Sequence, residues 1–382
     1  MSPTPHLKRL LAEGFLEAAR VLETGEGGER IRVGLTTPGS EHGIAEVVRG
    51  GELAQKENPR LEVVLIGPPV VSDLSQVHTG PCAADAHRKM EELLDAGEIA
   101  AAVTMHYNFP VGVATVGKVI TPAQGREMYL ATTTGTAATD RVQAMIYNAL
   151  YGIAVAQSTG VPEPTLGILN VDGSRQVERA LGQLRERGFK INLAESLRAD
   201  GGCIMRGNDL LAATPDVMVC DTLTGNLLMK VFSAYTTGGN YEASGYGYGP
   251  GVGPGYNRII NIVSRASGAP VIAASIAYAG AAARGKLPRV AATLWEAAER
   301  AGLNSLAVPA KTTPQAVAIP PRKPVDQEIS GIDVLELENA AKTLWQEDIY
   351  AETGMGCSGP VILVAAEDLE RSQEILHKAG YL

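Results

Sequence analysis

Short runs of aliphatic and β-branched residues alternate with helical patterns along most of the chain, and no other feature constrains the fold as strongly. The runs predict strands over residues 31–37, 61–67, 100–105, 127–134, 165–171, 190–196, 216–221, 258–264 and 361–366. Strands that alternate with helices pair in parallel through helical crossovers. We therefore expect an α/β fold with a mostly parallel sheet, helices on both faces, and ligands at the carboxyl ends of the strands.

The 382 residues of the chain suffice for two domains, or for one large α/β unit, at a usual domain size of roughly 150 residues. Residues 310–332 are rich in proline and polar side chains, which is typical of a linker or a surface arm. We expect a main domain over residues 1–309, with two subdomains around a cleft. A carboxyl-terminal helix, loop, strand and helix over residues 333–382 should pack on it.

The charge of the chain limits its partners. A formal net charge of -9 argues against a surface that grips nucleic acid phosphates. No apolar run reaches the eighteen or so residues of a membrane span, and the first residues show no signal-peptide pattern. We expect a cytoplasmic protein that binds neither nucleic acid nor a membrane.

The four cysteines lie far apart and show no spacing typical of zinc ligands or of a disulfide framework, so no metal site is expected: Cys82, Cys203, Cys220 and Cys357. Most lone cysteines are small buried hydrophobic residues, and Cys220, in an apolar run, fits that interpretation.

Cys357 differs because glycines surround it in the stretch ETGMGCSGP, residues 352–360. Small neighbours leave a sulfur accessible, as a nucleophile requires. Backbone amides at Gly356, Ser358 and Gly359 would stabilise the oxyanion of an acyl-transfer reaction. The alternative interpretation is a glycine-rich turn with an inert cysteine.

The segment DVMVCDTLTGNLLMKVF, residues 216–232, predicts a strand, a turn and a helix. Asp221 would end the strand, and the turn from Thr222 through Thr224 and Gly225 to Asn226 would aim free helix amides at a phosphate. Thr224 also fits a simpler role as a helix cap, which is the commoner case for a threonine before an apolar run.

Residues 235–256 are dense in glycine and tyrosine and lie inside the α/β repeat. We expect an ordered loop near the site, with a flexible lid as the alternative, because long structureless loops are uncommon there unless functional. No GxGxxG or GxxxxGK[ST] spacing occurs between a strand and a helix, so the sequence predicts no dinucleotide or Walker site.

Three segments resemble, in order and spacing, the second half of the phosphate acyltransferases of the phospholipid-synthesis and phosphotransacetylase superfamily: GILNVDG (167–173), INLAESLRADGG (191–202) and TPDVMVCDTLTGNLLMK (214–230). The resemblance implies a fold of the isocitrate and isopropylmalate dehydrogenase type. It also implies acyl exchange between a thioester and inorganic phosphate as a substrate, with no tightly bound cofactor.

The same resemblance implies site residues. Asp221, Gly225 and Asn226 match the family's turn between strand and helix. Glu195 and Arg198 match its Glu-x-x-Arg stretch. Asn108, in MHYNFPVG, is the one counterpart of an earlier Gly-Asn-Thr-Gly turn.

A second resemblance covers nearly the whole chain through four long strings: RADGGCIMRGNDLL (198–211), TLTGNLLMKVFSAYTTGG (222–239), GYGYGPGVGPGYNRI (245–259) and ETGMGCSGP (352–360). They look like the component C alpha subunits of glycine, sarcosine or betaine reductase complexes. The resemblance implies that a carboxymethyl group arrives as a selenoether on selenoprotein component A. It becomes an acetyl thioester on a cysteine matched by Cys357, and acetyl phosphate is released.

Further candidates complete the predicted site. Arg198 and Arg206 are expected phosphate ligands, although Arg206 paired with Asp209 fits equally well. Lys230 is expected to extend to solvent. His106, which follows a strand, is the best candidate for a base, with His42 as a second, and both also fit hydrogen-bonded loop histidines.

Three functional hypotheses remain open from the sequence. The first is the acetyl-phosphate-forming subunit, whose implied partners are a component C beta subunit, selenoprotein component A and a second copy of the chain as a homodimer. The second is a generic phosphate acyltransferase that acts on a coenzyme A or acyl-carrier thioester without a covalent intermediate. The third is a scaffold subunit that docks a thiol-bearing partner and has no reactive cysteine.

Overall fold

The computed structural model describes residues 30–199, 201–306, 318–332, 336–356 and 359–382, together with residues 14, 15, 18, 19 and 22. Of residues 355, 356, 359 and 360 it describes the backbone alone. The chain forms two compact units, residues 1–306 and residues 307–382. We call them the main unit and the carboxyl-terminal unit.

The strands of the main unit are β1 Ile31–Thr36, β2 Leu61–Gly67, β3 Ser75–His78, β4 Ala101–Thr104, β5 Ala114–Ile120, β6 Glu127–Gly135, β7 Thr165–Leu169, β8 Asn192–Leu193, β9 Ile204–Met205, β10 Val217–Val219, β11 Gly249–Val252 and β12 Ile260–Ile262. Its helices are α2 Ile44–Glu57, α3 Ala83–Asp95, α4 Arg141–Ser158, α5 Ser174–Glu186, α6 Gly207–Ala212, α7 Thr222–Ala234, α8 Ala269–Arg284 and α9 Leu287–Arg300, with short 3-10 helices at Tyr235–Thr237 and Leu303–Ser305.

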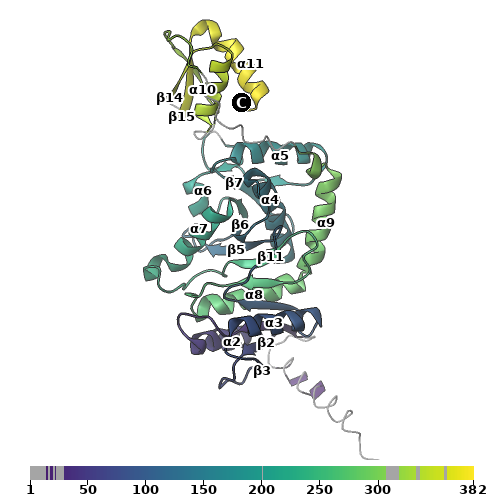
Figure 1. The fold of residues 1–382 in the computed structure, drawn as a ribbon. Helices are drawn as coiled ribbons and strands as arrows, with labels where there is room; N and C mark the ends of the chain where they lie inside the picture. Colours follow the sequence, from purple (N-terminus) through teal and green to yellow (C-terminus); the bar gives the residue numbers. More distant parts are fainter. Residues whose placement is uncertain are drawn as a thin grey trace, which may run out of the picture. The chain divides into compact units, whose positions relative to one another are not determined.

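These strands form one sheet in the order β3-β2-β1-β4-β12-β11-β5-β6-β10-β7-β8, with β9 also beside β7. The strands from β3 to β12 are parallel to one another, as are β6, β10, β7 and β8. Between these blocks β11 is antiparallel to both of its neighbours, and β5 is antiparallel to β6. The two parallel blocks therefore run in opposite directions and meet at β11 and β5 (Figure 1).

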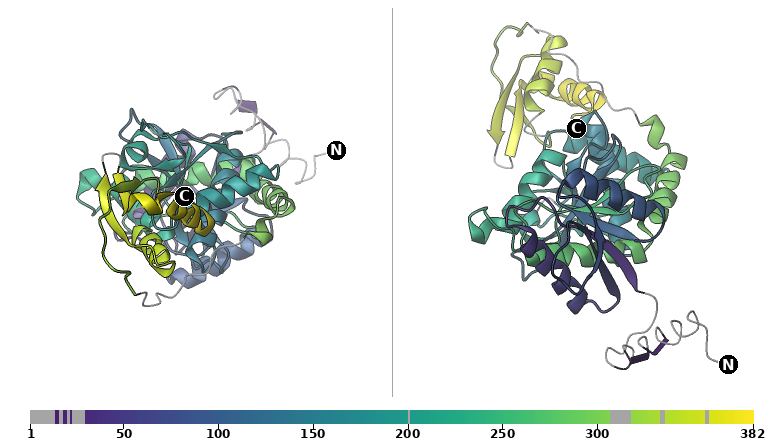
Figure 2. Two further views of the ribbon diagram at one scale, coloured as in Figure 1. Left: turned by 90° about the horizontal axis from the view of Figure 1, so that it is seen from above. Right: turned by 60° about the horizontal axis from the view of Figure 1, so that its bottom comes forward.

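Helices cover both faces of each block because successive side chains of a buried strand point to opposite faces. In the first block Val63 lies beside α2, whereas Val64 packs with Met90 of α3. In the second block Ala131 and Val217 lie against Gly152 of α4, whereas Leu130 and Met218 pack with Met229 of α7. Figure 2 shows the strands of this unit lying between helices in two further views.

The carboxyl-terminal unit is a three-stranded antiparallel sheet with two helices. Its elements are β13 Gln327–Ile329, α10 Leu337–Gln346, β14 Ala351–Gly356, β15 Gly359–Val364, a 3-10 helix at Ala366–Asp368 and α11 Leu369–Ala379. The strand order is β13-β15-β14, and an apolar cluster that includes Ile329, Leu344, Ile362 and Leu376 forms the core.

The predicted fold class is confirmed, since the sheet is mostly parallel and helices lie on both faces. Two predictions at the carboxyl end differ from the structure. Residues 327–329, expected within the linker, pair with β15 and place Ile329 in the core. Residues 351–356, expected to form a loop, are strand β14. None of the helices in the described part of the chain is both long and apolar enough to cross a bilayer.

Candidate active site

A cavity of about 560 Å³ opens beside α7, at the junction of the two parallel blocks. We call it the central cleft. It is lined by residues 105–109 after β4, the end of β6, one side of α7, Tyr248 and the residues that follow β12. Open α/β sheets bind ligands at such places, where strands end and the strand order changes direction.

Three residues predicted from separate segments meet at this cleft. His106 and Asn108 lie on the loop after β4, and both are exposed. Asn226 reaches the cleft from α7 and donates from its Nδ2 to the carbonyl oxygen of Thr133, 3.1 Å away. The structure therefore brings together polar groups about 120 residues apart in sequence, in agreement with crossover connections.

Lys230 belongs to the same cleft, which corrects the expectation that it extends to solvent. Its Nζ lies 2.6 Å from Oε1 of Glu242 and 3.4 Å from Oγ of Ser264. Glu242 is 0% exposed and also accepts from Ser267 Oγ and Tyr248 OH. A buried carboxylate is stable only with such partners, so Glu242 fixes a cation on the wall of the cleft.

A carboxylate of the chain itself, that of Asp221, occupies the amino end of α7. Asp221 caps the helix by accepting from the backbone N of Thr224, 3.1 Å away, and from its Oγ1, 2.6 Å away. Arg141 Nη2 also donates to this carboxylate. Burial opposes ionisation of Asp221, but the bonds from Thr224 and Arg141 outweigh it and lower the pKa. The expected phosphate donors at Thr224 are thus engaged by Asp221, and the helix cap is Asp221, not Thr224.

Gly225 brings α7 unusually close to β6. A Cβ atom there would lie 1.8 Å from the carbonyl oxygen of Thr132, so only glycine fits. Beside it, the hydroxyls of Thr222 and Thr132 are 3.2 Å apart. Gly225 therefore acts through packing, by setting Asn226 and Lys230 at their places along the cleft.

The other predicted residues surround a buried carboxylate, Asp209, at the carboxyl ends of β7, β8 and β9. Asp209 is 0% exposed and accepts from the backbone N of Leu197 and of Arg206 and from Ser196 Oγ. Burial opposes its ionisation, but these bonds lower its pKa. Arg206 thus meets Asp209 through its backbone, while its side chain is exposed.

Arginines gather around this carboxylate. The pKa of Arg198 is lowered, first by burial and then by the charges of Arg206 and Arg175, so the three guanidinium groups lie near one another. Glu195 stands at the same turn, since a Cβ on Gly201 would lie 2.9 Å from its Oε1. These residues form a second polar region beyond the amino end of α7, and they do not line the central cleft.

A second cavity, of about 480 Å³, shares Met105 and His106 with the central cleft. His87 of α3 lines it, and its Nε2 lies 2.9 Å from Oγ1 of Thr104. Burial lowers the pKa of His87, and the charge of His106 lowers it further. The lowered pKa favours the neutral imidazole of His87, a form that can accept a proton.

Two comparisons with known proteins cover most of the chain. The model of a family described as "Fatty acid synthesis protein" matches residues 31–363. The "Glycine/sarcosine/betaine reductase complex component C subunit alpha" of Peptoclostridium acidaminophilum is 53% identical over 380 residues, which are 98% of each chain. The chain belongs to the family of these component C alpha subunits.

More distant relatives share parts of the chain. A phosphate acyltransferase of Gluconobacter oxydans (strain 621H) is 37% identical over 83 residues, 22% of each chain. A branched-chain phosphotransacylase from Enterococcus faecalis V583 has a TM-score of 0.46 at 16% identity, and it covers 66% of this chain and 99% of its own. The resemblance to component C alpha subunits that the sequence predicts is confirmed.

The cysteine that the family resemblance singles out, Cys357, lies outside the described residues with Ser358, between β14 and β15. Gly356 and Gly359 are the last pair in the register of these two strands. Two other cysteines are buried. Burial raises the pKa of Cys203 to about 12 and raises that of Cys220 further. Cys82 is exposed.

Sequence reasoning missed Lys230, Glu242, Tyr248 and His87 as members of the site. Lys230 could have been found, because it lies four residues after Asn226 and hence on the same side of α7. Glu242 and Tyr248 stand in the glycine- and tyrosine-rich segment, which contains β11. For His87 no sequence signal points to the cleft.

Proposed function

We propose that this chain is the acetyl-transfer subunit of a reductase complex in the cytoplasm. It takes a carboxymethyl group from a selenoether on selenoprotein component A, carries an acetyl thioester on Cys357 and releases acetyl phosphate. The reduction of carboxymethyl to acetyl takes two electrons from the selenium, which is left bonded to a second thiol of the complex, and one water is released. The observation that carries the proposal is the 53% identity over 98% of both chains with a component C alpha subunit. The glycine-flanked Cys357 and a cleft with a fixed cation support it.

The release step needs a thiol and a bound phosphate. A phosphate oxygen attacks the carbonyl carbon of the thioester, and the electron pair of the carbon–sulfur bond leaves with the thiolate. The oxyanion that forms needs N–H donors, which the backbone around Cys357 would supply at Gly356, Ser358 and Gly359.

In this proposal the central cleft handles the phosphate. Lys230 supplies a charge that Glu242 holds in place, and Asn108 and Ser264 add donors beside it. His106, with His87 behind it, accepts the proton that phosphate loses on attack. Arg198 and Arg206, at the carboxyl ends of β8 and β9, are the second candidate region for the anion.

The implied partners are a component C beta subunit, component A and a second copy of this chain. An apolar stripe on α7 supports a protein contact there. Leu223, Leu227, Val231 and Tyr235 recur every four residues, and the exposed fractions of Leu223 and Tyr235 are 81% and 82%. Apolar side chains in such a row on an exposed helix are typical of an interface.

A second candidate function is a phosphate acyltransferase that uses a coenzyme A or acyl-carrier thioester directly. The 83-residue match to a phosphate acyltransferase favours it. This function would need no covalent intermediate on Cys357. The two functions differ in whether the thiol of Cys357 carries the acyl group.

The test is phosphate-dependent acyl exchange by the purified chain and by its Cys357→Ala variant, with Cys82→Ala as the control. We expect the loss of Cys357 to lower the rate by about 10³-fold or more, as the loss of a covalent nucleophile does, and Cys82→Ala to leave it unchanged. Retained exchange in Cys357→Ala would select the direct acyltransferase. An equal loss of rate in Cys357→Ala and Cys82→Ala would show that the loss is not specific to Cys357, and it would contradict the covalent intermediate.

A further inference from the structure

A basic groove runs along one side of α9, away from the central cleft. Its volume is about 760 Å³, and five cationic side chains line it without a single acidic one: Arg187, Lys190, Lys286, Arg289 and Arg300. All five are exposed. In a chain of net charge -9 this groove is a local reversal of sign.

The cations of the groove are largely unpaired. Within the described part of the chain, Lys190, Lys286, Arg289 and Arg300 form no ion pair or side-chain hydrogen bond, and Arg187 donates to Ser305 Oγ. Several exposed cations elsewhere have acidic partners, such as Arg49 with Glu46 and Arg88 with Asp85. Exposed charges that repel one another without internal partners are ready to bind an anion.

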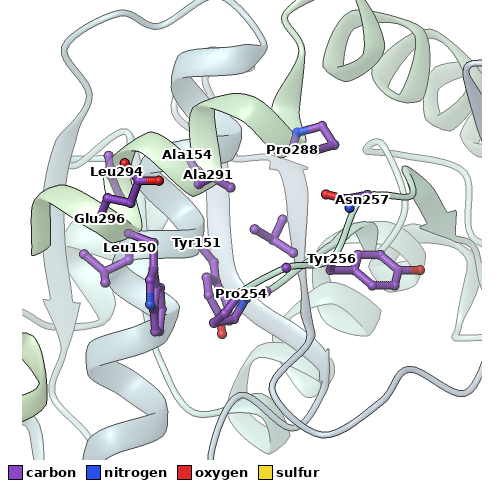
Figure 3. Close-up of a pocket in the computed structure, with 15 residues that line it drawn as sticks. Leu150, Tyr151, Ala154, Pro254, Tyr256, Asn257, Pro288, Ala291, Leu294 and Glu296 are labelled. Atoms are coloured by element: carbon purple, nitrogen blue, oxygen red, sulfur yellow. The ribbon is translucent and has the colours of Figure 1, made fainter. Parts of the chain in front are cut away.

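The acidic residues near the groove do not line it. Glu299 of α9 accepts from Trp295 and Asn304. Glu296 lines a separate apolar pocket of about 190 Å³ on the opposite side of α9, with Tyr151 of α4 and Pro254 (Figure 3). Glu163 lies in an adjoining cavity that shares Lys190 with the groove. The acidic residues of α9 therefore leave the field of the groove positive.

The shape of the groove indicates an extended occupant. Along α9 the groove runs from Lys286 to Arg300, and 14 helical residues at 1.5 Å per residue span about 21 Å. Cations stand at both ends, and apolar side chains that include Val290, Leu294 and Ala297 lie between them. A single phosphate or a nucleoside phosphate concentrates its charge at one point and would leave part of this row unpaired.

We propose that the basic groove docks an acidic amphipathic segment of another protein. Acidic side chains of the segment would pair with the cations at both ends, and its apolar side chains would cover the middle of α9, as in helix-in-groove recognition. The net charge of the chain is -9, so long-range repulsion disfavours an acidic partner over most of the surface, and the groove favours docking at this place.

The position of the groove separates it from the proposed chemistry. Residues 187–190 precede β8 and lie at its amino end, whereas Glu195 and Arg206 lie at the carboxyl ends of β8 and β9. A docked partner segment would leave the central cleft open. This inference does not depend on Cys357 or on the proposed function.

The test is fluorescence anisotropy of a labelled amphipathic helical peptide of about 14 residues, with glutamates on one face and leucines on the other. The groove variant is Lys190→Glu with Arg289→Glu, and the control variant is Lys56→Glu with Arg126→Glu, an equal change of charge at exposed positions outside the groove. We expect the groove variant to weaken binding about tenfold or more and the control less than about twofold.

Three results would overturn the proposal. In the first, both variants lose binding equally, so that net charge alone explains it. In the second, a peptide with glutamine in place of glutamate binds as well. In the third, the peptide does not bind, whereas ATP binds to the native chain and not to the groove variant. That result would assign the groove to a small polyanion. A thermal unfolding scan of each variant shows that the fold is intact.

Discussion

The two units of the chain differ in what they bury. The main unit places acidic side chains in its interior, since Glu242 and Asp209 are both 0% exposed and each is held by several donors. The core cluster of the carboxyl-terminal unit is apolar, from Ile329 to Leu376. This unit has twelve acidic and six basic residues over 307–382, a net charge of -6 within the chain's -9.

This difference separates two chemical requirements of acyl transfer. A cation fixed by a buried carboxylate needs a large, well-packed interior, which the main unit provides around Lys230. An accessible thiol needs only a short strand connection with small neighbours, which the sequence around Cys357 provides. We infer that the chain assigns anion chemistry to the first unit and the thiol to the second. The following predictions test that assignment.

The largest contrast is expected among the four thiols. Buried Cys203, with a pKa of about 12, and Cys220, with a pKa raised further, should react with iodoacetamide about 10³-fold more slowly at pH 7 than Cys82. Cys357 should react at least as fast as Cys82. Peptide mapping over time measures all four rates. If Cys357 reacted with iodoacetamide as slowly as Cys220, the carboxyl-terminal unit would not supply a reactive thiol.

Gly225→Ala should destabilise the main unit by about 3 kcal/mol, because the new methyl group would overlap the Thr132 carbonyl oxygen. Gly182→Ala is the matched control. Nothing lies within 4 Å of a Cβ at that helical position, so the change should stabilise the fold by about 0.5–1 kcal/mol. Urea unfolding measures both. Equal stabilities of the two variants would contradict the close approach of α7 to β6.

Lys230→Met should lower the phosphate-dependent step about 10²-fold, the usual effect of removing one preorganised charge from an acyl-transfer site. Acylation of Cys357 by an acyl donor under the same conditions should change much less. Lys56→Met, at an exposed position on α2, is the control. If Lys230→Met left the dependence of the rate on phosphate concentration unaltered, Lys230 would not act on the phosphate, and the assignment of anion chemistry to the main unit would be contradicted.

Asp209→Asn should cost about 2 kcal/mol of stability at pH 7, because it weakens charged hydrogen bonds in the interior. The pKa of Asp209 is lowered in the folded state, so its ionised form stabilises the fold above the unfolded-state value of about 3.9. That contribution is lost as the pH falls through the lowered folded pKa. The unfolding free energies of the native chain and of Asp209→Asn should therefore converge in acid. A difference that widens in acid would contradict a stabilising ionised Asp209.

How far the sequence predicts the molecule depends on the kind of contact. All eight strands expected in the main unit appear, and strands such as β2 and β6 form because their apolar runs are buried on both faces. Of the strand expected over residues 190–196, only Asn192–Leu193 is paired, and neither residue is buried. Strand β11, Gly249–Val252, has no such signal, since two of its four residues are glycine and one is proline. It exists through pairing with β12 and β5 and not through its own propensity.

The residues of the candidate site also differ in how far the sequence predicts them. His106, Asn108 and Asn226 follow predicted strands or turns, so topology alone places them near one another. Lys230 and Glu242 could not be paired from sequence, because a loop of irregular backbone decides where Glu242 is buried. At the start of α7 the backbone N and Oγ1 of Thr224 donate to Asp221, so these donors serve the helix cap and not a phosphate.

The central claim is that Cys357 carries the acyl group, and mass spectrometry of the intact chain after incubation with acetyl phosphate tests it most directly. The account predicts an adduct of about 42 Da that maps to Cys357, disappears on addition of phosphate or arsenate, and does not form in Cys357→Ala. No adduct on the native chain, with acyl exchange that persists in Cys357→Ala, would contradict the claim and leave the central cleft to act alone.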